Sequence, residues 1–346
     1  MSLLEVKNLR VRFDTRRGPV QAVEHVSLRV ERGELVALVG ESGSGKSVSA
    51  LALLALLPRP PAVIETGEAW FEGRNLLTLG ERELRRVRGA QIALVPQDPN
   101  TALHPLYTIG DQIVEALQLH RELSRAAARD VAAQALSEVG VPAARERLDA
   151  YPHELSGGLR QRAMIAMAIA LEPKLLIADE PTTALDVTVQ AQILELLTRL
   201  RRERDLGVLL ITHDLGLVAQ YADRVGVMYC GAIVESAPTR ELFRAPAHPY
   251  TRGLLASAKS LDGPHGAKLE SIGGLPPDPL APPPGCAFAP RCAFAVEACT
   301  HARPPSLPPS GLRALASSGV EVDIAAERRV ACFEHERVLA RAGDPA

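Results

Sequence analysis

The chain has 346 residues, of which 47% are hydrophobic and 23% charged, as in an ordinary globular protein of about two domains. A formal net charge of −2 excludes a general electrostatic attraction to nucleic acid, so no nucleic-acid partner is expected. No apolar stretch approaches the roughly 18 residues that a membrane-spanning helix needs, and residues 1–7 lack the apolar core of a signal peptide. We therefore expect a cytoplasmic protein that reaches a membrane only through a partner.

Alternating apolar and polar residues open the chain. This pattern over residues 3–30, with a turn near Arg17-Gly18-Pro19, predicts antiparallel strands. Phe13 lies in the first of them. Its flat ring could stack on an adenine base, and an ordinary core phenylalanine is the equal alternative.

A phosphate-binding loop follows the next apolar run. Its sequence, Gly40-Glu41-Ser42-Gly43-Ser44-Gly45-Lys46-Ser47, fits G-x-x-x-x-G-K-[ST] without a mismatch. Residues 34–39 before it predict a buried strand, and residues 48–57 predict a helix that Pro58 stops. The glycines let several N–H groups point at one place, and the helix N-terminus adds partial positive charge. A polyphosphate is therefore the expected ligand.

The residues of this loop have distinct expected roles. Lys46 would reach the β- and γ-phosphates as a point charge, and the Ser47 hydroxyl would ligate Mg²⁺. The alternative is a glycine-rich turn that binds nothing. The residues expected to contact the nucleotide here are Gly40, Ser42, Gly43, Ser44, Gly45, Lys46, Ser47 and Val48.

Residues 62–97 again have a strand-like pattern, clearest over 69–71 and 91–95. Pro96 ends the second of these runs, and Gln97 follows at the strand tip. The amide of Gln97 could meet a metal ion or a water in the nucleotide site, whereas an isolated glutamine would be a surface residue.

Residues 106–150 change to a helical pattern, with Ser124 as a helix N-cap and Gly140 as a C-cap glycine. We expect a separate helical subdomain over about residues 100–160. It ends at Leu155-Ser156-Gly157-Gly158, before a helix predicted over 163–171. Ser156, Gly157 and Gly158 predict a second anion site, the alternative being a simple N-cap serine with two loop glycines.

Two apolar strands then end in polar residues. Leu175 to Asp179 is followed by Glu180, and carboxylates at such strand ends lie where open α/β sheets bind ligands. Asp179 would hold Mg²⁺ through a water, and Glu180 would act as general base. The strand over 207–212 leads to His213, which could contact the γ-phosphate or serve only as a structural histidine.

In this order the motifs resemble the ATPase domains of ABC transporters. Gly40–Ser47 resembles the Walker A loop, Gln97 the Q-loop, Leu155–Gly158 the signature and Leu175–Glu180 the Walker B strand. Ala184-Leu185-Asp186 resembles the D-loop, His213 the switch histidine and Phe13 the aromatic residue that stacks on adenine. The resemblance implies an α/β P-loop NTPase with an N-terminal antiparallel β-subdomain. It adds Asp186 to the site and implies that Ser156 and Gly158 cover the ATP held by Lys46 of a second ATPase.

Finer features resemble the oligopeptide/dipeptide importer branch. They are Asp98-Pro99, Arg160-Gln161-Arg162 and the segment over 248–255. This branch implies an ATPase on the cytoplasmic face of the membrane that drives uptake of di- or oligopeptides. Its partners would be two permease subunits, a second and related ABC ATPase, and an extracytoplasmic substrate-binding protein. The alternative is a soluble ABC ATPase of translation or DNA repair.

Residues 256–346 are expected to form a C-terminal extension to an ATPase domain over 1–255. Prolines over 275–284 predict an extended linker. Cys286, Cys292, Cys299 and Cys332 follow, whereas Cys230 is predicted to be a buried core thiol. Four thiolates suit a [4Fe-4S] cluster or a zinc ion, or they stay unligated. The importer branch implies the cluster. We further expect the extension to be independent of the phosphate loop.

Overall fold

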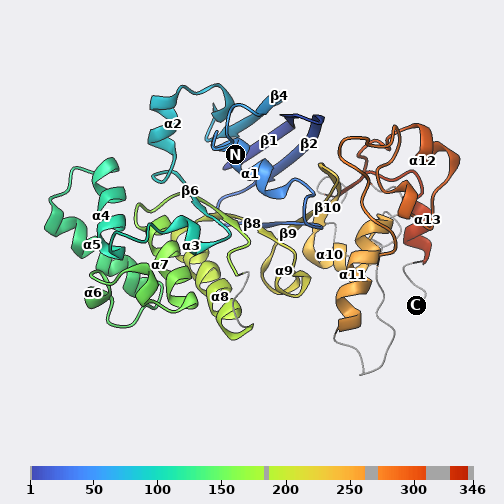
Figure 1. Cartoon of the computed structure of the whole chain (residues 1–346). Helices are drawn as coiled ribbons and strands as arrows, with labels where there is room; N and C mark the ends of the chain where they lie inside the picture. Colours follow the sequence, from blue (N-terminus) through green and yellow to red (C-terminus); the bar gives the residue numbers. More distant parts are fainter. Residues whose placement is uncertain (1, 183–186, 262–271, 309–327, 342–346) are drawn as a thin grey trace. The chain divides into compact units, whose positions relative to one another are not determined.

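The computed structural model describes residues 2–182, 187–261, 272–308 and 328–341 (Figure 1). The chain divides into two compact units. The first comprises Met1–Leu4, Arg29–Leu35 and Trp70–Ile211. The second comprises Glu5–Leu28, Val36–Ala69 and Thr212–Ala346. Within the described ranges, no helix is long and apolar enough to cross a membrane.

Three parallel strands form the centre of the first unit: β6 (Ile92–Val95), β7 (Leu175–Asp179) and β8 (Gly207–Thr212). All five residues of β7 are buried, as its uninterrupted apolar run predicts. Val95 lies opposite Ala178, and Asp179 lies opposite Ile211. The residues that follow β6 and β7 therefore leave the strands at the same edge.

Helices surround these strands, and α4 to α7 gather into one group (Figure 1). Ser124 caps α5 by accepting a hydrogen bond from the N–H of Ala127, which confirms the predicted helix start. The helical segments of this unit are η1 (Leu76–Thr78), α2 (Glu81–Val87), α3 (Pro99–Ala102), α4 (Ile109–His120), α5 (Arg125–Glu138), α6 (Ala144–Arg147), η2 (Pro152–Glu154), α7 (Gly157–Ile169) and α8 (Val187–Arg204).

The second unit contains two sets of strands. In the first set β1 (Leu4–Thr15) lies between β2 (Gly18–Val30) and β4 (Ala62–Phe71). The end of β4, Trp70–Phe71, belongs to the first unit and pairs there with β5 (Arg74–Asn75). In the second set β3 (Leu35–Val39) runs parallel to β9 (Arg224–Tyr229). β9 pairs antiparallel with β10 (Ala232–Pro238), and β10 with β11 (Arg329–Val330). The antiparallel N-terminal strands agree with the sequence pattern.

The C-terminal extension packs into the core of the second unit. Phe288 is 4% exposed, and its ring lies 5.4 Å from that of Tyr229 on β9 and 5.5 Å from that of Tyr250. The residues over 272–288, which include the proline-rich linker, contain no helix or strand. The helical segments of the second unit are α1 (Lys46–Leu53), α9 (Leu215–Tyr221), α10 (Thr239–Arg244), α11 (Pro249–Leu261), η3 (Ala289–Arg291), α12 (Glu297–His301) and α13 (His335–Ala340).

Two sequence-based helix boundaries are wrong, and one helix was missed. The helix after the phosphate loop spans Lys46–Leu53 instead of 48–57, because Ala55 adopts a left-handed backbone with φ of 50°. The strand-like range 62–97 is interrupted by α2, an amphipathic turn whose Leu84 and Val87 are buried. α7 begins at Gly157, six residues before the predicted start at 163, because Ser156 is its N-cap.

Candidate functional site

The phosphate loop connects β3 to α1 and requires glycine at two places. Gly40 has φ of 153° and Gly45 has φ of 100°, both in the region that side chains disfavour. A Cβ atom at Gly40 would lie 2.1 Å from the carbonyl oxygen of Met228, and one at Gly45 would lie 2.3 Å from that of Ala22. The backbone of neighbouring strands therefore sets the shape of this loop.

Lys46 is the buried cation of the loop, with 5% of its surface exposed. Its Nζ donates hydrogen bonds to the carbonyl oxygens of Gly40 and Glu41, at 2.9 and 3.0 Å. Ser42 and Gly43 are exposed at the tip, whereas Ser44 is buried. Ser47 and Val48 are half-buried in the first turn of α1. An ammonium group, turned backbone and a helix N-terminus together form a site that can bind a polyphosphate.

In the first unit, Gln97 and Glu180 meet where β6 and β7 end. The Nε2 of Gln97 donates to Oε2 of Glu180 at 3.1 Å. Glu180 has a left-handed backbone with φ of 47°, and its N–H donates to the carbonyl oxygen of Ile211 at 2.8 Å. Asp179, one residue earlier, is 7% exposed. The predicted base and the predicted Q-loop glutamine are therefore brought together.

The signature segment forms the N-terminus of α7. Ser156 Oγ accepts from the N–H of Leu159 at 3.4 Å, so its hydroxyl is a weak N-cap. Ser156 and Gly157 are exposed. Gly158 is half-buried, and an added Cβ would lie in tight contact with Val189, 3.2 Å from its Cγ1. The segment thus presents a small, polar helix start to its surroundings.

The remaining predicted site residues are His213, Phe13 and Asp186. His213 is exposed just after β8, and Asp214 beside it caps α9 by accepting from the N–H of Leu217 at 3.1 Å. Phe13 is half-buried on β1. Asp186, with the rest of the predicted D-loop, lies outside the described residues.

Sequence reasoning missed two contacts beside the predicted motifs. Arg291 of the extension binds the carboxylate of Glu41 in the phosphate loop, at 3.0 and 3.1 Å. The extension and the phosphate loop are therefore in direct contact, whereas the sequence predicts that they are independent. Arg160, after the signature, donates to Oδ1 of Asn100 at 2.7 Å and so ties α7 to α3. Neither pair has a sequence signal, because each joins residues far apart in the chain.

Four cysteines of the extension line a single pocket, together with Phe288 and Phe294. These are Cys286, Cys292, Cys299 and Cys332, and none of them forms a disulfide. The pocket has a cavity volume of about 10 Å³, room for about one water molecule. Cys230, predicted to be buried, is half-buried and packs against the core of this unit.

Three of these thiols lie in surroundings that disfavour the thiolate. Burial raises the pKa of Cys286 and of Cys292, and it raises the pKa of Cys332 to about 12. The N–H of Phe294 donates to Sγ of Cys292 at 3.3 Å, a contact that favours the thiolate. In the described part of the chain, no group of three or more His, Cys, Asp or Glu side chains has the arrangement of a metal-ion site.

Comparison with known families and proteins places these features. Residues 23–183 match the ABC transporter family, and residues 234–299 match the family described as the oligopeptide/dipeptide transporter C-terminal region. Over 303 residues the chain is 50% identical to the oligopeptide transport ATP-binding protein OppD of Bacillus subtilis (strain 168), covering 88% of this chain and 85% of that one. The chain belongs to the ABC transporter ATP-binding subunits.

Two further relatives of this ABC ATPase have similar coverage. The dipeptide transport ATP-binding protein DppD of the same bacterium is 51% identical over 87% of this chain and 90% of its own length. A putative peptide import ATP-binding protein of Brucella melitensis biotype 1 is 52% identical over 88% of this chain and 93% of its own length.

Solved structures agree with the predicted fold of the ABC ATPase. A dimeric ATP-binding cassette in a post-hydrolysis state, bound to ADP and Pi, matches with a TM-score of 0.61 and 27% identity, over 68% of this chain and 99% of that one. The cbiO1 protein of Clostridium perfringens, part of the ABC transporter complex cbiONQ, matches with a TM-score of 0.60 and 26% identity. The match covers 70% of this chain and 90% of that one. The α/β P-loop ATPase prediction is confirmed, and the protein is an ATPase.

Proposed function

We propose that this ABC ATPase drives the uptake of di- or oligopeptides across the cytoplasmic membrane. The observation that carries the proposal is a phosphate loop with a buried lysine in the same chain as an oligopeptide/dipeptide transporter C-terminal region. The names of its relatives support peptide import, and none of those three names points to translation or DNA repair.

The proposed chemistry divides among the motifs. Lys46 and the loop N–H groups would bind the phosphates of ATP, with the ring of Phe13 against the adenine. Mg²⁺ would be held by Ser47, Gln97 and Asp179, whose hydroxyl, amide and carboxylate oxygens are the ligands this cation prefers. Bound Mg²⁺ supplies charge neutralisation at the phosphates. Glu180 would take the proton of the attacking water, and His213 would contact the γ-phosphate.

A second ATPase subunit would complete the site. Ser156, Gly157 and Gly158 would bind the γ-phosphate of the partner's ATP, with Asp186 near the shared interface. The exposure of Ser156 and Gly157 supports this role, since a helix start that faces outward can receive an anion from another molecule. We propose a related, non-identical ATPase as that subunit.

The remaining partners follow from the same proposal. Two permease subunits would hold the chain at the cytoplasmic face of the membrane, and an extracytoplasmic binding protein would deliver the peptide. We propose an ABC ATPase domain over residues 1–255, with a helical subdomain over about 100–160, and an extension over 256–346.

The four thiols of the extension are proposed to hold a [4Fe-4S] cluster. Four unbridged cysteines around one pocket supply the thiol donor set of such a cluster, which fits. Zinc and unligated thiols are the alternatives. Elemental analysis of protein purified without oxygen should find about four irons per chain for a cubane. One zinc without iron would establish the zinc site, and no metal in a protease-resistant extension would exclude both.

Uptake in cells tests the transport function. A strain lacking this chain should lose uptake of labelled di- and tripeptides, and wild-type protein should restore it whereas Lys46→Ala should not. A free amino acid taken up by another system serves as the control. Normal peptide uptake in the deletion strain would contradict the proposal.

A further inference from the structure

Arg291 is a buried arginine of the extension that binds a carboxylate of the phosphate loop. Its side chain is 4% exposed, and it holds both carboxylate oxygens of Glu41, at 3.0 and 3.1 Å. It also donates to the carbonyl oxygens of Ile272 and Gly273, and to the hydroxyl of Tyr229 at 3.3 Å. The guanidinium is therefore fixed from several sides in a two-pronged ion pair.

Glu41 connects this ion pair to the centre of the loop. Its carbonyl oxygen accepts from Nζ of Lys46 at 3.0 Å and from the N–H of Ser44 at 3.2 Å. Its own N–H donates to the hydroxyl of Tyr250 at 2.9 Å. The residue that places Lys46 is thus held by two side chains from the region that matches the transporter extension, residues 234–299.

Because Glu41 is negatively charged, its ion pair with Arg291 should affect the affinity for nucleotide. A carboxylate one residue beyond Gly40 has the same sign as the polyphosphate that the loop binds, and like charges in a partly buried site repel strongly. Arg291 cancels that charge and keeps the carboxylate turned toward the extension. Without Arg291, the loop would contain an uncompensated anion.

We propose that Arg291 is a positioning residue of the ATP site, which it prepares by neutralising Glu41. The inference rests on the proposed role of Gly40–Ser47 as the ATP site. Arg291 lies in η3, between Cys286 and Cys292, so the folding of the cysteine-rich segment sets nucleotide affinity. The extension therefore contributes to nucleotide binding.

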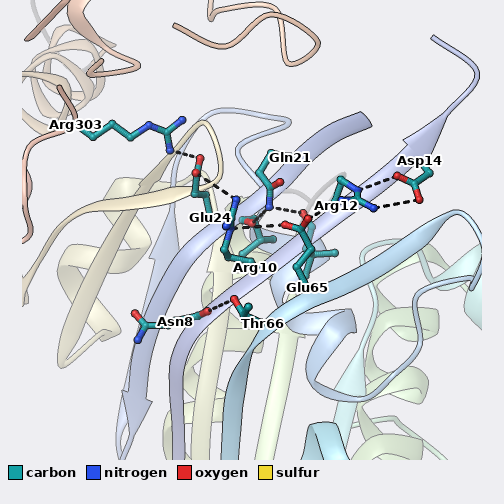
Figure 2. Close-up of polar contacts among 11 residues, drawn as sticks. Asn8, Arg10, Arg12, Asp14, Gln21, Glu24, Glu65, Thr66 and Arg303 are labelled. Atoms are coloured by element: carbon teal, nitrogen blue, oxygen red, sulfur yellow. Dashed lines mark hydrogen bonds and ion pairs between the residues drawn. The ribbon is translucent and has the colours of Figure 1, made fainter. Parts of the chain in front are cut away.

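A second arginine of the extension provides a matched control. Figure 2 shows Arg303 pairing with Glu24 of β2, beside the ion pairs of Arg10 and Arg12 with Glu65. Its side chain is 46% exposed, compared with 4% for Arg291, and Glu24 lies outside the phosphate loop. Removing this pair changes a contact of the extension but adds no charge to the loop.

The test is a charge-rescue cycle, read as the affinity for a fluorescent ATP analogue in the full chain. Arg291→Gln, which keeps N–H donors for the neighbouring carbonyls, should weaken binding about tenfold, and less at high salt. Adding Glu41→Gln to Arg291→Gln removes the uncompensated anion and should restore the affinity to within about twofold of wild type. Arg303→Ala should not change the affinity. In the assembled transporter, Arg291→Gln should raise KM for ATP and leave kcat unchanged.

Rescue separates a charge effect from simple loss of structure. An unchanged affinity in Arg291→Gln would overturn the proposal, and so would a weakened affinity that Glu41→Gln does not restore. If Arg291→Gln does not fold, Arg291→Lys keeps the charge without the two-pronged contact and should bind within about threefold of wild type; a larger loss would overturn the proposal. If Lys46→Ala binds the analogue normally, the proposed ATP site itself is wrong, which is a distinct result.

Discussion

The phosphate loop and the signature segment are both short runs of glycine and serine before a helix, yet they differ in burial and in the contacts that hold them. Ser44 and Lys46 of the phosphate loop are 4% and 5% exposed, and backbone atoms of Ala22 and Met228 fix its glycines. In the signature, Ser156 and Gly157 are exposed, and the Ser156 hydroxyl accepts only a long hydrogen bond, 3.4 Å, from the N–H of Leu159. The first site is built within one chain, whereas the second offers its helix N-terminus outward.

This difference indicates that the two segments have different roles in nucleotide binding. A preformed, buried cation can bind nucleotide in an isolated subunit, because little has to move when the ligand arrives. An exposed helix start gains its partner only from another molecule. Substitutions in the phosphate loop should therefore weaken ATP binding by the single chain. Substitutions in the signature should instead weaken closure between two subunits.

The largest expected effect concerns turnover after both sites have closed. Glu180→Gln removes the proposed base but keeps the amide contact available to Gln97, so kcat in the assembled transporter should fall about a thousandfold. Nucleotide affinity should stay within about threefold of wild type, because the phosphate contacts remain. Steady-state hydrolysis and analogue binding measure the two quantities. Turnover near the wild-type rate would mean that another group is the base.

Lys46→Ala should have the next largest effect. It removes a buried ammonium whose hydrogen bonds to Gly40 and Glu41 organise the loop, so affinity of the isolated subunit for ATP should fall about a hundredfold. Ser156→Ala is the matched variant at the signature and should leave that affinity unchanged. Equal losses in the two variants would remove the distinction between the two segments.

Gly158→Asp should act on closure alone. The aspartate places a negative charge where the partner's γ-phosphate is expected, so ATP-dependent association of subunits should weaken at least about tenfold. Light scattering with a Glu180→Gln background measures association. Gly158→Ala is the control for crowding, since its Cβ would lie 3.2 Å from Val189. Association of Gly158→Asp at the wild-type ATP concentration would contradict the role of the signature.

The last expected effect is on folding stability and concerns His248, two residues before the tyrosine that accepts a hydrogen bond from the phosphate loop. His248 is fully buried, its Nδ1 accepts from the N–H of Tyr250 at 3.1 Å, and burial lowers its pKa to about 3. The unfolded chain, with a pKa near 6.5, takes up the proton first, so stability is complete above about pH 6.5 and falls as the pH drops toward 3. At pH 5 the loss should be about 2 kcal/mol.

Urea titration at pH 7.5 and pH 5 measures this loss. His248→Asn keeps a hydrogen-bond acceptor but cannot be protonated, and it should reduce the difference between the two pH values. If the free energy of unfolding of His248→Asn depends on pH as that of wild type does, other groups cause the pH dependence.

Sequence reasoning succeeded where the signal was local. Uninterrupted apolar runs predicted β3 and β7, and Ser124 marked the start of α5. The loop pattern alone identified Lys46 as the cation of the phosphate loop. Such features depend on neighbours within a few residues, which the sequence displays directly.

Sequence reasoning failed where the local structure or a contact has no signal in the neighbouring residues. The end of α1 depends on a left-handed Ala55, a conformation that alanine does not predict. Glu41 and Arg291 are separated by 250 positions, and nothing near either residue marks the other as its partner. The cysteines were recognised by type, whereas the aromatic packing that joins their segment to Tyr229 and Tyr250 was not.

Reconstitution tests the central claim most directly. The chain would be assembled in liposomes with its two permease subunits and second ATPase, and ATP hydrolysis measured with and without the peptide-loaded binding protein. We predict that the loaded binding protein stimulates hydrolysis and that Glu180→Gln abolishes the stimulated rate. Hydrolysis that ignores the loaded binding protein and rises instead with ribosomes or damaged DNA would contradict a role in peptide import.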